Sequence, residues 1–334
     1  MKKSLLFCGV AALAFASCTQ NEVLDVNENR AIGFNAFSGK ATRTVSDITG
    51  TGGGTFTQFN IYGSYKKSTG NAVNILTNED VTYSSGWGYT NTQYWTDATY
   101  NFVAYSNGNA KIVYNEDENN ISYTHDGGLT ISNYNVATEK KDLVVATQTK
   151  TVNSGDLSGT IAPVELTFNH VLSKVKFTIT PKGFPSYQTV KVTELKIRGS
   201  KTVGKFSSNG SAWSEQGTPA DIVYAEIANI NTTYTPDECY VLPQSLVDGV
   251  DVVFTVTVND GNTDIMRKSF TVDLHNLTLS EWKKGNAYNY TTEITPQDVD
   301  SNIKEIKFTV NETVGWITPE SDGSDDNVDQ DLGL

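Results

Sequence analysis

Short runs in which apolar and polar residues alternate constrain the fold of this chain more than any other feature. The runs are separated by clusters of Gly, Asn, Asp and Ser. Successive side chains of a strand point to opposite faces, so each run predicts a strand with one buried face. Many short strands at this spacing predict an all-β fold of packed sandwiches. The alternating residues are Ile32, Phe34 and Ala36; Phe59, Ile61 and Tyr65; Val175, Phe177 and Ile179; Val252, Phe254, Val256 and Val258; Phe270, Val272 and Leu274; and Ile306, Phe308 and Val310.

The alternation changes phase at two places. Val164, Leu166 and Phe168 have even numbers, whereas the next run begins with the odd-numbered Val175. The same change separates two neighbouring pairs, which are Val190 with Val192 and Leu195 with Ile197. A one-residue slip moves all later side chains to the other face of a strand, so each change predicts a β-bulge or a crossing between sheets.

The segment Pro181-Lys182-Gly183-Phe184-Pro185 has the composition of a linker and divides the chain into two halves of similar size. We therefore expect an N-terminal β-sandwich domain over residues 31–180 and a C-terminal one over residues 181–316. The remaining stretch, residues 317–334, is acidic and is expected to be a disordered tail.

The first residues have the pattern of an export signal. Two lysines follow Met1, and an apolar stretch that is too short for a permanent membrane span leads to small residues before Cys18. This pattern predicts a signal peptide over residues 1–17, acylation of Cys18, and a lipidated linker over residues 18–30. Lipid on Cys18 would anchor the chain in a membrane. The alternative is an ordinary secretory signal with an incidental cysteine.

The charge and the cysteine count exclude several classes. The chain carries a net charge of −13, and removing the two lysines of residues 1–17 takes it to −15. Nucleic-acid binding needs a basic surface, so no nucleic-acid partner is expected. Of three cysteines, only Cys239 would remain as a free thiol, so the fold must depend on apolar burial without a disulfide.

The residues that carry common catalytic chemistry are scattered. His125, His170 and His275 lie far apart, and no nucleophile motif or phosphate-binding glycine loop accompanies them. The acidic clusters lack the glycine and glutamate positions of a calcium loop. We therefore expect no enzyme activity, no catalytic residue, no metal site and no cofactor.

Aromatic residues gather between Tyr83 and Tyr105. Trp87 and Trp95 are candidates for stacking on a ligand such as a glycan. The alternative is packing across a hairpin, because aromatic side chains also pair between strands.

Several motifs together resemble the Bacteroidales fimbrillins of the FimA/Mfa-like group. Their order and spacing cover nearly the whole chain after the signal segment. They are the cysteine motif at Cys18; Ile32-Gly33-Phe34; Thr42-Arg43-Thr44; Ser84-Ser85-Gly86-Trp87; Tyr94-Trp95; residues 100–105; residues 166–175, which include His170-Val171-Leu172-Ser173-Lys174-Val175; Tyr240-Val241-Leu242-Pro243-Gln244; and residues 282–288.

This resemblance implies a lipoprotein pilin with two tandem transthyretin-like β-sandwich domains. Members that polymerise are cut by an arginine-directed protease and then accept a strand from another subunit, which is donor-strand exchange. Here the cut would follow Arg43, the removed strand would be Ala31–Phe37, and the donor would be Ile303–Val310.

The resemblance also implies partners and a location. The partners are other pilin subunits, the outer membrane through lipid on Cys18, and a host or glycan ligand for adhesion. The place is the cell surface, in a fimbrium. The alternative is a non-polymerising surface lipoprotein that binds glycans or host ligands, such as an anchor or tip subunit that stays uncut.

Overall fold

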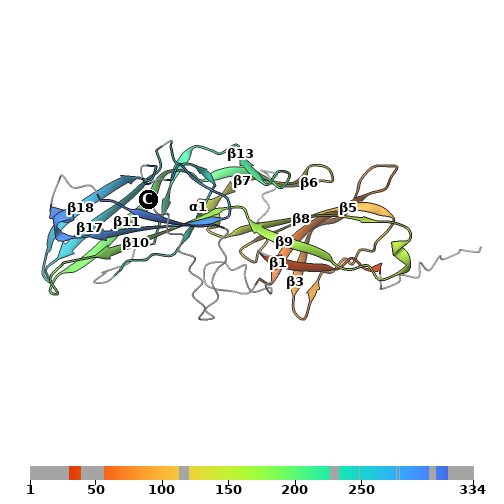
Figure 1. Cartoon of the computed structure of the whole chain (residues 1–334), viewed down its shortest axis with the longest axis horizontal. Helices are drawn as coiled ribbons and strands as arrows, with labels where there is room; N and C mark the ends of the chain where they lie inside the picture. The colour runs from red at the N-terminus through yellow and green to blue at the C-terminus, as the bar shows by residue number, and fades with distance from the viewer. Residues whose placement is uncertain are drawn as a thin grey trace, which may run out of the picture.

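The computed structural model describes residues 30–38, 56–112, 120–225, 233–247, 249–275, 277, 279–300 and 306–314. Strands form nearly all of its regular structure, as the alternating runs predict. The helical segments are short: α1 (Val136–Glu139), η3 (Asp156–Ser158) and α2 (Pro296–Asp300). No described helix has both the length and the apolar composition that crossing a membrane requires. Figure 1 shows an elongated molecule, with the sheets of the N-terminal part at one end and those of the C-terminal part at the other.

The N-terminal end is a seven-stranded sheet in the order β1-β9-β8-β5-β2-β3-β4. Its strands are β1 (Phe34–Ser38), β2 (Gln58–Lys66), β3 (Val73–Tyr83), β4 (Trp87–Gly88), β5 (Ala98–Asn107), β8 (Leu143–Val152) and β9 (Val164–His170). One face of this sheet encloses an apolar core. A ring of β9, the strand next to the β1 edge, meets a ring of β2, since Phe168 lies 5.3 Å from Phe59. The sheet therefore curls so that its ends face each other.

The C-terminal end is a sandwich of two four-stranded sheets. One has the order β15-β10-β20-β21, with β10 (Ser173–Pro181), β15 (Cys239–Val241), β20 (Asn286–Ile294) and β21 (Thr309–Val314). The other has the order β14-β11-β17-β18, with β11 (Thr189–Lys201), β14 (Pro219–Val223), β17 (Asp251–Asn259) and β18 (Asp264–Asp273). The expected alternation is confirmed here, since Val175, Phe177 and Ile179 are fully buried between the two sheets.

A third sheet joins the two ends. It has the order β13-β12-β7-β6 and is built from β6 (Ile121–Thr124), β7 (Gly128–Asn135), β12 (Val203–Ser207) and β13 (Ala212–Ser214). Strands β6 and β7 come from the first half of the chain, and β12 and β13 come from the second. A further two-stranded ribbon pairs β16 (Gln244–Ser245) with β19 (Glu281–Trp282). One apolar cluster runs from β5 and β8 through β7 into the C-terminal sandwich, so the halves share a core.

Both predicted phase changes have a structural cause. The first is the crossing between the N-terminal and C-terminal sheets, which occupies Val171 and Leu172 between β9 and β10. At this crossing His170 Nδ1 lies 2.7 Å from Oδ2 of the buried Asp142, which ties the end of β9 to the start of β8. The second is a bulge in β11, where the register with β17 shifts after Thr193 and Glu194 takes a φ of 57°.

The strand pairing corrects the expected domain division at residues 180 and 181. Strand β10 ends at Pro181 but pairs with β15 and β20, so the chain has entered the C-terminal sandwich by Ser173. The proline-rich segment after it is a loop within that sandwich, where Lys182 N donates to the carbonyl of Ile294 at 2.8 Å. The residues assigned to a signal peptide, to the lipidated linker up to Asn29 and to the acidic tail lie outside the described part of the chain.

Candidate functional site: the seat of strand β1

Strand β1 is an edge strand with an uncommon parallel partner. It pairs with β9 in the register Phe34↔Val164 to Ser38↔Phe168, and none of the described strands pairs with its other side. The preceding residues reach back to the other end of the curled sheet. Ile32 N donates to the carbonyl of Gln93 at 2.8 Å, and Trp95 N donates to that of Arg30 at 2.9 Å. Residues 30–38 therefore close the N-terminal core between two separate backbone partners.

The inward side chains of this segment are apolar and buried. Ile32, Phe34 and Ala36 are all at most 4% exposed, as their alternation predicts. The Phe34 ring lies 5.5 Å from that of Tyr89, 5.6 Å from that of Phe102 and 6.4 Å from that of Phe59. We call the rings of Tyr89, Phe102 and Phe59, together with Phe168, the aromatic seat. Burying side chains the size of Ile32 and Phe34 contributes about 3–6 kcal/mol in total.

Polar contacts complete the seat without adding charge to it. The Tyr89 hydroxyl donates to the carbonyl of Ile32 at 2.8 Å and accepts from Gln93 N at 3.1 Å. Burial raises the pKa of Tyr89, so its phenol stays protonated as a donor near neutral pH. On the outer face of β1, Asn35 Nδ2 donates to Glu165 Oε1 at 2.9 Å.

The chemistry of this arrangement is strand pairing. If β1 left, it would expose one edge of β9 and an apolar slot above the aromatic seat. An open edge of this kind is a template for another extended segment with apolar residues at every second position. No cluster of three or more His, Cys, Asp or Glu side chains that could hold a metal occurs within the described ranges.

The predicted site residues fall in different places. Cys18 and Arg43 lie outside the described residues. Trp95 is 2% exposed, and its ring lies 4.6 Å from that of Tyr100 in the N-terminal core, so it offers no face to a ligand and the packing alternative describes it better. Trp87 is half-buried, 4.9 Å from Phe59. Two further rings lie beside it, those of Phe56 at 5.4 Å and of Tyr83, which is 41% exposed, at 5.3 Å.

The predicted donor segment is also placed differently from its expected bounds. The last strand, β21, begins at Thr309, whereas Ile306 and Phe308 precede it and are buried in the C-terminal core. Phe308 lies 6.0 Å from Phe177 and from Phe254. The segment is thus an integral part of this chain's own C-terminal sandwich. Residues 303–305 lie outside the described part.

Sequence reasoning did not find Tyr89, Gln93 or the parallel partner β9. Gln93 acts through its backbone, for which no residue pattern exists. The signal for Tyr89 was its place in an aromatic-rich stretch, but the stretch alone did not separate it from Trp87. Cys239 behaves as expected for an inert thiol: burial raises its pKa to about 12, and its Sγ lies 2.8 Å from the Tyr224 hydroxyl.

The elongated all-β architecture, with its first described strand closing an aromatic core at a sheet edge, places the chain among β-sandwich proteins. The chain matches the family described as fimbrillin-like over residues 42–312, and it belongs to that family. The match begins after β1. No curated protein matched the chain.

Solved structures share the fold. A putative cell adhesion protein from Bacteroides uniformis is 18% identical, with a TM-score of 0.53 over 86% of this chain and 99% of that one. A fimbrial protein from Bacteroides vulgatus is also 18% identical, with a TM-score of 0.53 over 85% and 98%. A putative cell adhesion protein from Bacteroides ovatus is 15% identical, with the same TM-score over 87% and 98%.

Proposed function

We propose that the chain is a structural or accessory subunit of cell-surface fimbriae that is exported as a lipoprotein through Cys18 and contributes to adhesion. Cleavage after Arg43 would release β1, and a strand of another subunit would then occupy the aromatic seat. The observation that carries the proposal is the seating of β1: a sheet-edge segment, five residues before Arg43, places Ile32, Phe34 and Ala36 into the core. Family membership supports the fimbrial part. We infer a binding and assembly role rather than catalysis.

The donor is proposed to include residues 306–310. Ile306, Phe308 and Val310 repeat the every-second-residue spacing of the segment that now fills the seat. To act as a donor, this segment must leave its own sandwich, where Ile306 and Phe308 are buried. Its release would therefore cost burial in one subunit, and insertion into the next subunit's seat would offset that cost.

The mature N-terminus tests the processing step. Subunits isolated from the cell surface should begin at Thr44, whereas precursor from the membrane should begin at an acylated Cys18. An Arg43→Ala variant should accumulate as the lipid-linked form and yield no polymers, while the Lys40→Ala variant should be processed normally. Surface polymers built only from chains that begin at Cys18 would contradict cleavage after Arg43.

A peptide-binding experiment tests the seat separately. The chain beginning at Thr44 should bind a fluorescently labelled peptide of residues 304–314. The fluorescence anisotropy of the label measures this binding. The same peptide with Phe308→Asp should not bind, because a carboxylate would be buried among rings. A peptide of residues 30–38 serves as the reference occupant. Binding of the reference but not of residues 304–314 would move the donor to another segment or subunit.

The alternative function, a non-polymerising surface lipoprotein that binds glycans or host ligands, keeps one candidate platform. Trp87 and the exposed Tyr83 present neighbouring rings at the β3–β4 hairpin. If a ligand stacks there, Tyr83→Ala should abolish binding to it while leaving the unfolding transition unchanged. Loss of stability with unchanged binding would assign this pair to packing.

A further inference from the structure

A cavity of about 350 Å³ lies on the face of the seven-stranded sheet opposite the aromatic seat, between β3 and β6. This volume is at the lower end of the range for small-molecule sites, which is about 300–1,000 Å³. Its described walls carry aromatic, amide and hydroxyl groups and the aliphatic side chain of Ile121, but no charged side chain. The residues used below are Tyr62, Asn74, Thr77, Asn78, Ser122 and Tyr123.

A β-bulge builds one wall of this cavity. The pairing of β2 with β3 passes from Ile61↔Glu79 to Gly63↔Leu76, so β3 contains one more residue than β2 between these pairs. The extra length falls at Thr77 and Asn78, and Asn78 takes a left-handed φ of 52°. Bulges redirect side chains and are common beside functional sites, and asparagine tolerates this backbone conformation better than most residues.

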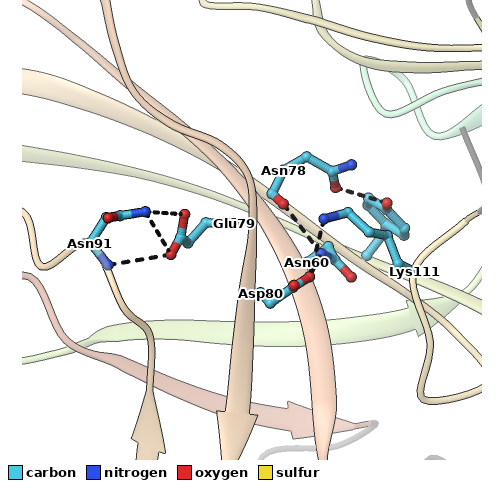
Figure 2. Close-up of polar contacts among 7 residues, drawn as sticks. Asn60, Asn78, Glu79, Asp80, Asn91 and Lys111 are labelled. Atoms are coloured by element: carbon cyan, nitrogen blue, oxygen red, sulfur yellow. Dashed lines mark hydrogen bonds and ion pairs between the residues drawn. The ribbon is translucent and has the colours of Figure 1, made fainter. Parts of the chain in front are cut away.

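The amide of Asn78 is held in one orientation. Its Oδ1 accepts from the Tyr105 hydroxyl at 2.8 Å, and its backbone carbonyl accepts from Asn60 Nδ2 at 3.3 Å. Figure 2 shows the contact between Asn78 and Asn60, with Asn78 and Glu79 pointing to opposite sides of β3. Burial raises the pKa of Tyr105, so its hydroxyl remains a donor at neutral pH. Asn78 Nδ2 is consequently left as a donor, with no hydrogen-bond acceptor among the described residues.

Asn60 holds the backbone of Asn78 in place and links it to a charged pair. Asn60 is fully buried, and its Nδ2 also donates to Asp80 Oδ1, which in turn lies 3.2 Å from Lys111 Nζ. Both charged groups are thus paired with each other, as Figure 2 shows, and neither lines the cavity. The described part of the cavity wall is therefore preorganised and carries no charged side chain.

Tyr123 forms the aromatic part of the opposite wall and is equally fixed. Its hydroxyl lies 2.7 Å from Ser64 Oγ and donates to the carbonyl of Asn101 at 2.9 Å. Its ring stacks on that of Tyr62, with 5.4 Å between centroids and 25° between planes. A ring that is held on one side by another ring and at its hydroxyl by two partners loses little conformational entropy when a ligand binds.

We propose that this cavity binds a neutral sugar residue, such as the terminal hexose or N-acetylhexosamine of a glycan. A sugar presents an apolar C–H face that suits a tyrosine ring, and its hydroxyls can exchange hydrogen bonds with amide and hydroxyl side chains. Asn78 Nδ2 would donate to one sugar hydroxyl, and Asn74, Thr77 and Ser122 would contact the others. Phosphorylated or sialylated ligands would bury a negative charge without a cation, which is costly.

This inference goes beyond fimbrial assembly, because the cavity lies on the opposite face of the sheet from the seat of β1 and is complete in one subunit. The experiment uses the chain from residue 19 onward as a monomer, so a failure of strand exchange does not affect the result. The probes are the methyl glycosides of glucose, galactose, mannose, N-acetylglucosamine, N-acetylgalactosamine and sialic acid. Binding is followed by saturation-transfer NMR and titration calorimetry.

At least one neutral glycoside should receive saturation, and methyl sialoside should not. Ser122→Trp, which places an indole at the cavity wall from an exposed position, should abolish the transfer, whereas Thr82→Trp, an exposed position on β3 away from the cavity, should retain it. Asn78→Gly keeps a residue suited to positive φ and removes the amide, so it should weaken binding by about tenfold or more. Unfolding transitions close to that of the unmodified chain identify the variants that are folded.

Three results would overturn the proposal: no transfer to any neutral glycoside, equal transfer to methyl sialoside, or transfer that survives both Ser122→Trp and Asn78→Gly. The last result would locate sugar binding elsewhere on the molecule, with the Tyr83 and Trp87 pair as the next place to examine.

Discussion

Strands β1 and β21 are the first and last strands of the described chain, and each is the edge of its sheet, yet they are attached in opposite ways. Strand β1 pairs in parallel with β9 and, with Ile32 before it, buries three apolar side chains. Strand β21 pairs antiparallel with β20, and no residue of it with a described side chain is fully buried. The attachment of β1 is therefore mainly apolar, whereas that of β21 depends on backbone pairing and polar contacts.

This difference bears on the proposed strand exchange. A strand held by its side chains leaves an apolar slot when it departs, and such a slot requires a new occupant. A strand held by a ladder of backbone hydrogen bonds leaves an edge that water can solvate. Under the proposed function, the N-terminal end would accept a strand, and the C-terminal end would lose β21 at a smaller cost in burial.

Removing each strand in turn should give the largest contrast. A chain that begins at Thr44 should lose about 3–6 kcal/mol of unfolding free energy, the contribution of burying Ile32 and Phe34. A chain truncated after Phe308 should lose about 1–2 kcal/mol, because it forfeits backbone pairing and the half-buried Val310. Urea unfolding followed by tryptophan fluorescence measures both. Equal losses would remove the basis for distinguishing the two edges.

Single substitutions should reproduce the contrast in stability between the two strands while leaving both strands in the chain. Phe34→Ala removes a ring that three other rings contact and should cost about 3–5 kcal/mol. Val310→Ala removes two methyl groups from a half-buried position and should cost about 1 kcal/mol or less. The same urea experiment serves, with an exposed substitution such as Thr82→Ala as the reference. A cost for Phe34→Ala below that for Val310→Ala would show that the seat is not tightly packed.

The alternating pattern predicted which residues of both edge segments turn inward, because burial on one face of a strand is a local property of the sequence. It also located the crossing near His170 and the bulge at Glu194 from changes of phase. Pairing is not local, however. Nothing in residues 34–38 specifies β9, which is about 130 residues away, and nothing in β7 specifies β12, so the shared third sheet and the true division of the chain stayed hidden.

The sequence likewise predicted some residues of the candidate site and not others. The inward residues of β1 follow from alternation, and Arg43 and Cys18 follow from motifs that the structure does not describe. The cavity beside Asn78 had no sequence signal, since it depends on an extra residue in β3 whose register only the partner strand β2 defines. Trp95 was offered as a platform because residue type alone does not report which face of a hairpin is covered.

High pH should weaken the C-terminal sandwich through groups buried in the sheet that contains β21. Burial raises the pKa of Cys239 to about 12 from its usual 9.0, and that of Tyr288 to about 12 from 10.0. Each group contributes its full stability below its unfolded pKa and loses it as the pH rises towards the folded value. The contribution of these two groups to the unfolding free energy should therefore be level below pH 9 and fall above it, by about 1.4 kcal/mol per pH unit for each group that titrates in the unfolded chain alone.

Cys239→Ala is the matched variant for this pH dependence. It should reduce the slope of unfolding free energy against pH just above pH 9 by the amount that one titrating group contributes. Tyr224 keeps a partner in this variant because its hydroxyl also donates to the carbonyl of Val175 at 3.1 Å. Urea unfolding at a series of pH values measures the slope. An unchanged slope would show that the thiol ionises in the folded chain as readily as in the unfolded one.

The smallest expected effect concerns the polar side-chain contacts of the two strands. On β21, Glu312 Oε1 accepts from Asn286 Nδ2 at 2.7 Å and from the Tyr288 hydroxyl at 3.0 Å. Glu312→Ala should therefore cost about 1 kcal/mol, because two partly buried donors lose their acceptor. On β1, Asn35 makes an exposed contact with Glu165, and Asn35→Ala should cost less than about 0.5 kcal/mol.

Glu312→Gln separates the role of the hydrogen-bond acceptor from that of the charge. The amide oxygen can still accept both hydrogen bonds, so urea unfolding of this variant should show most of the stability that Glu312→Ala loses.

Glu312 also limits which part of the C-terminal segment suits an aromatic seat. Glu312 has the same parity as Phe308 and Val310, so a donor extended through β21 would turn its carboxylate inward. A peptide of residues 304–314 carrying Glu312→Val should bind the chain that begins at Thr44 more tightly than the natural peptide does. Equal affinity would mean that the inserted part ends before Glu312.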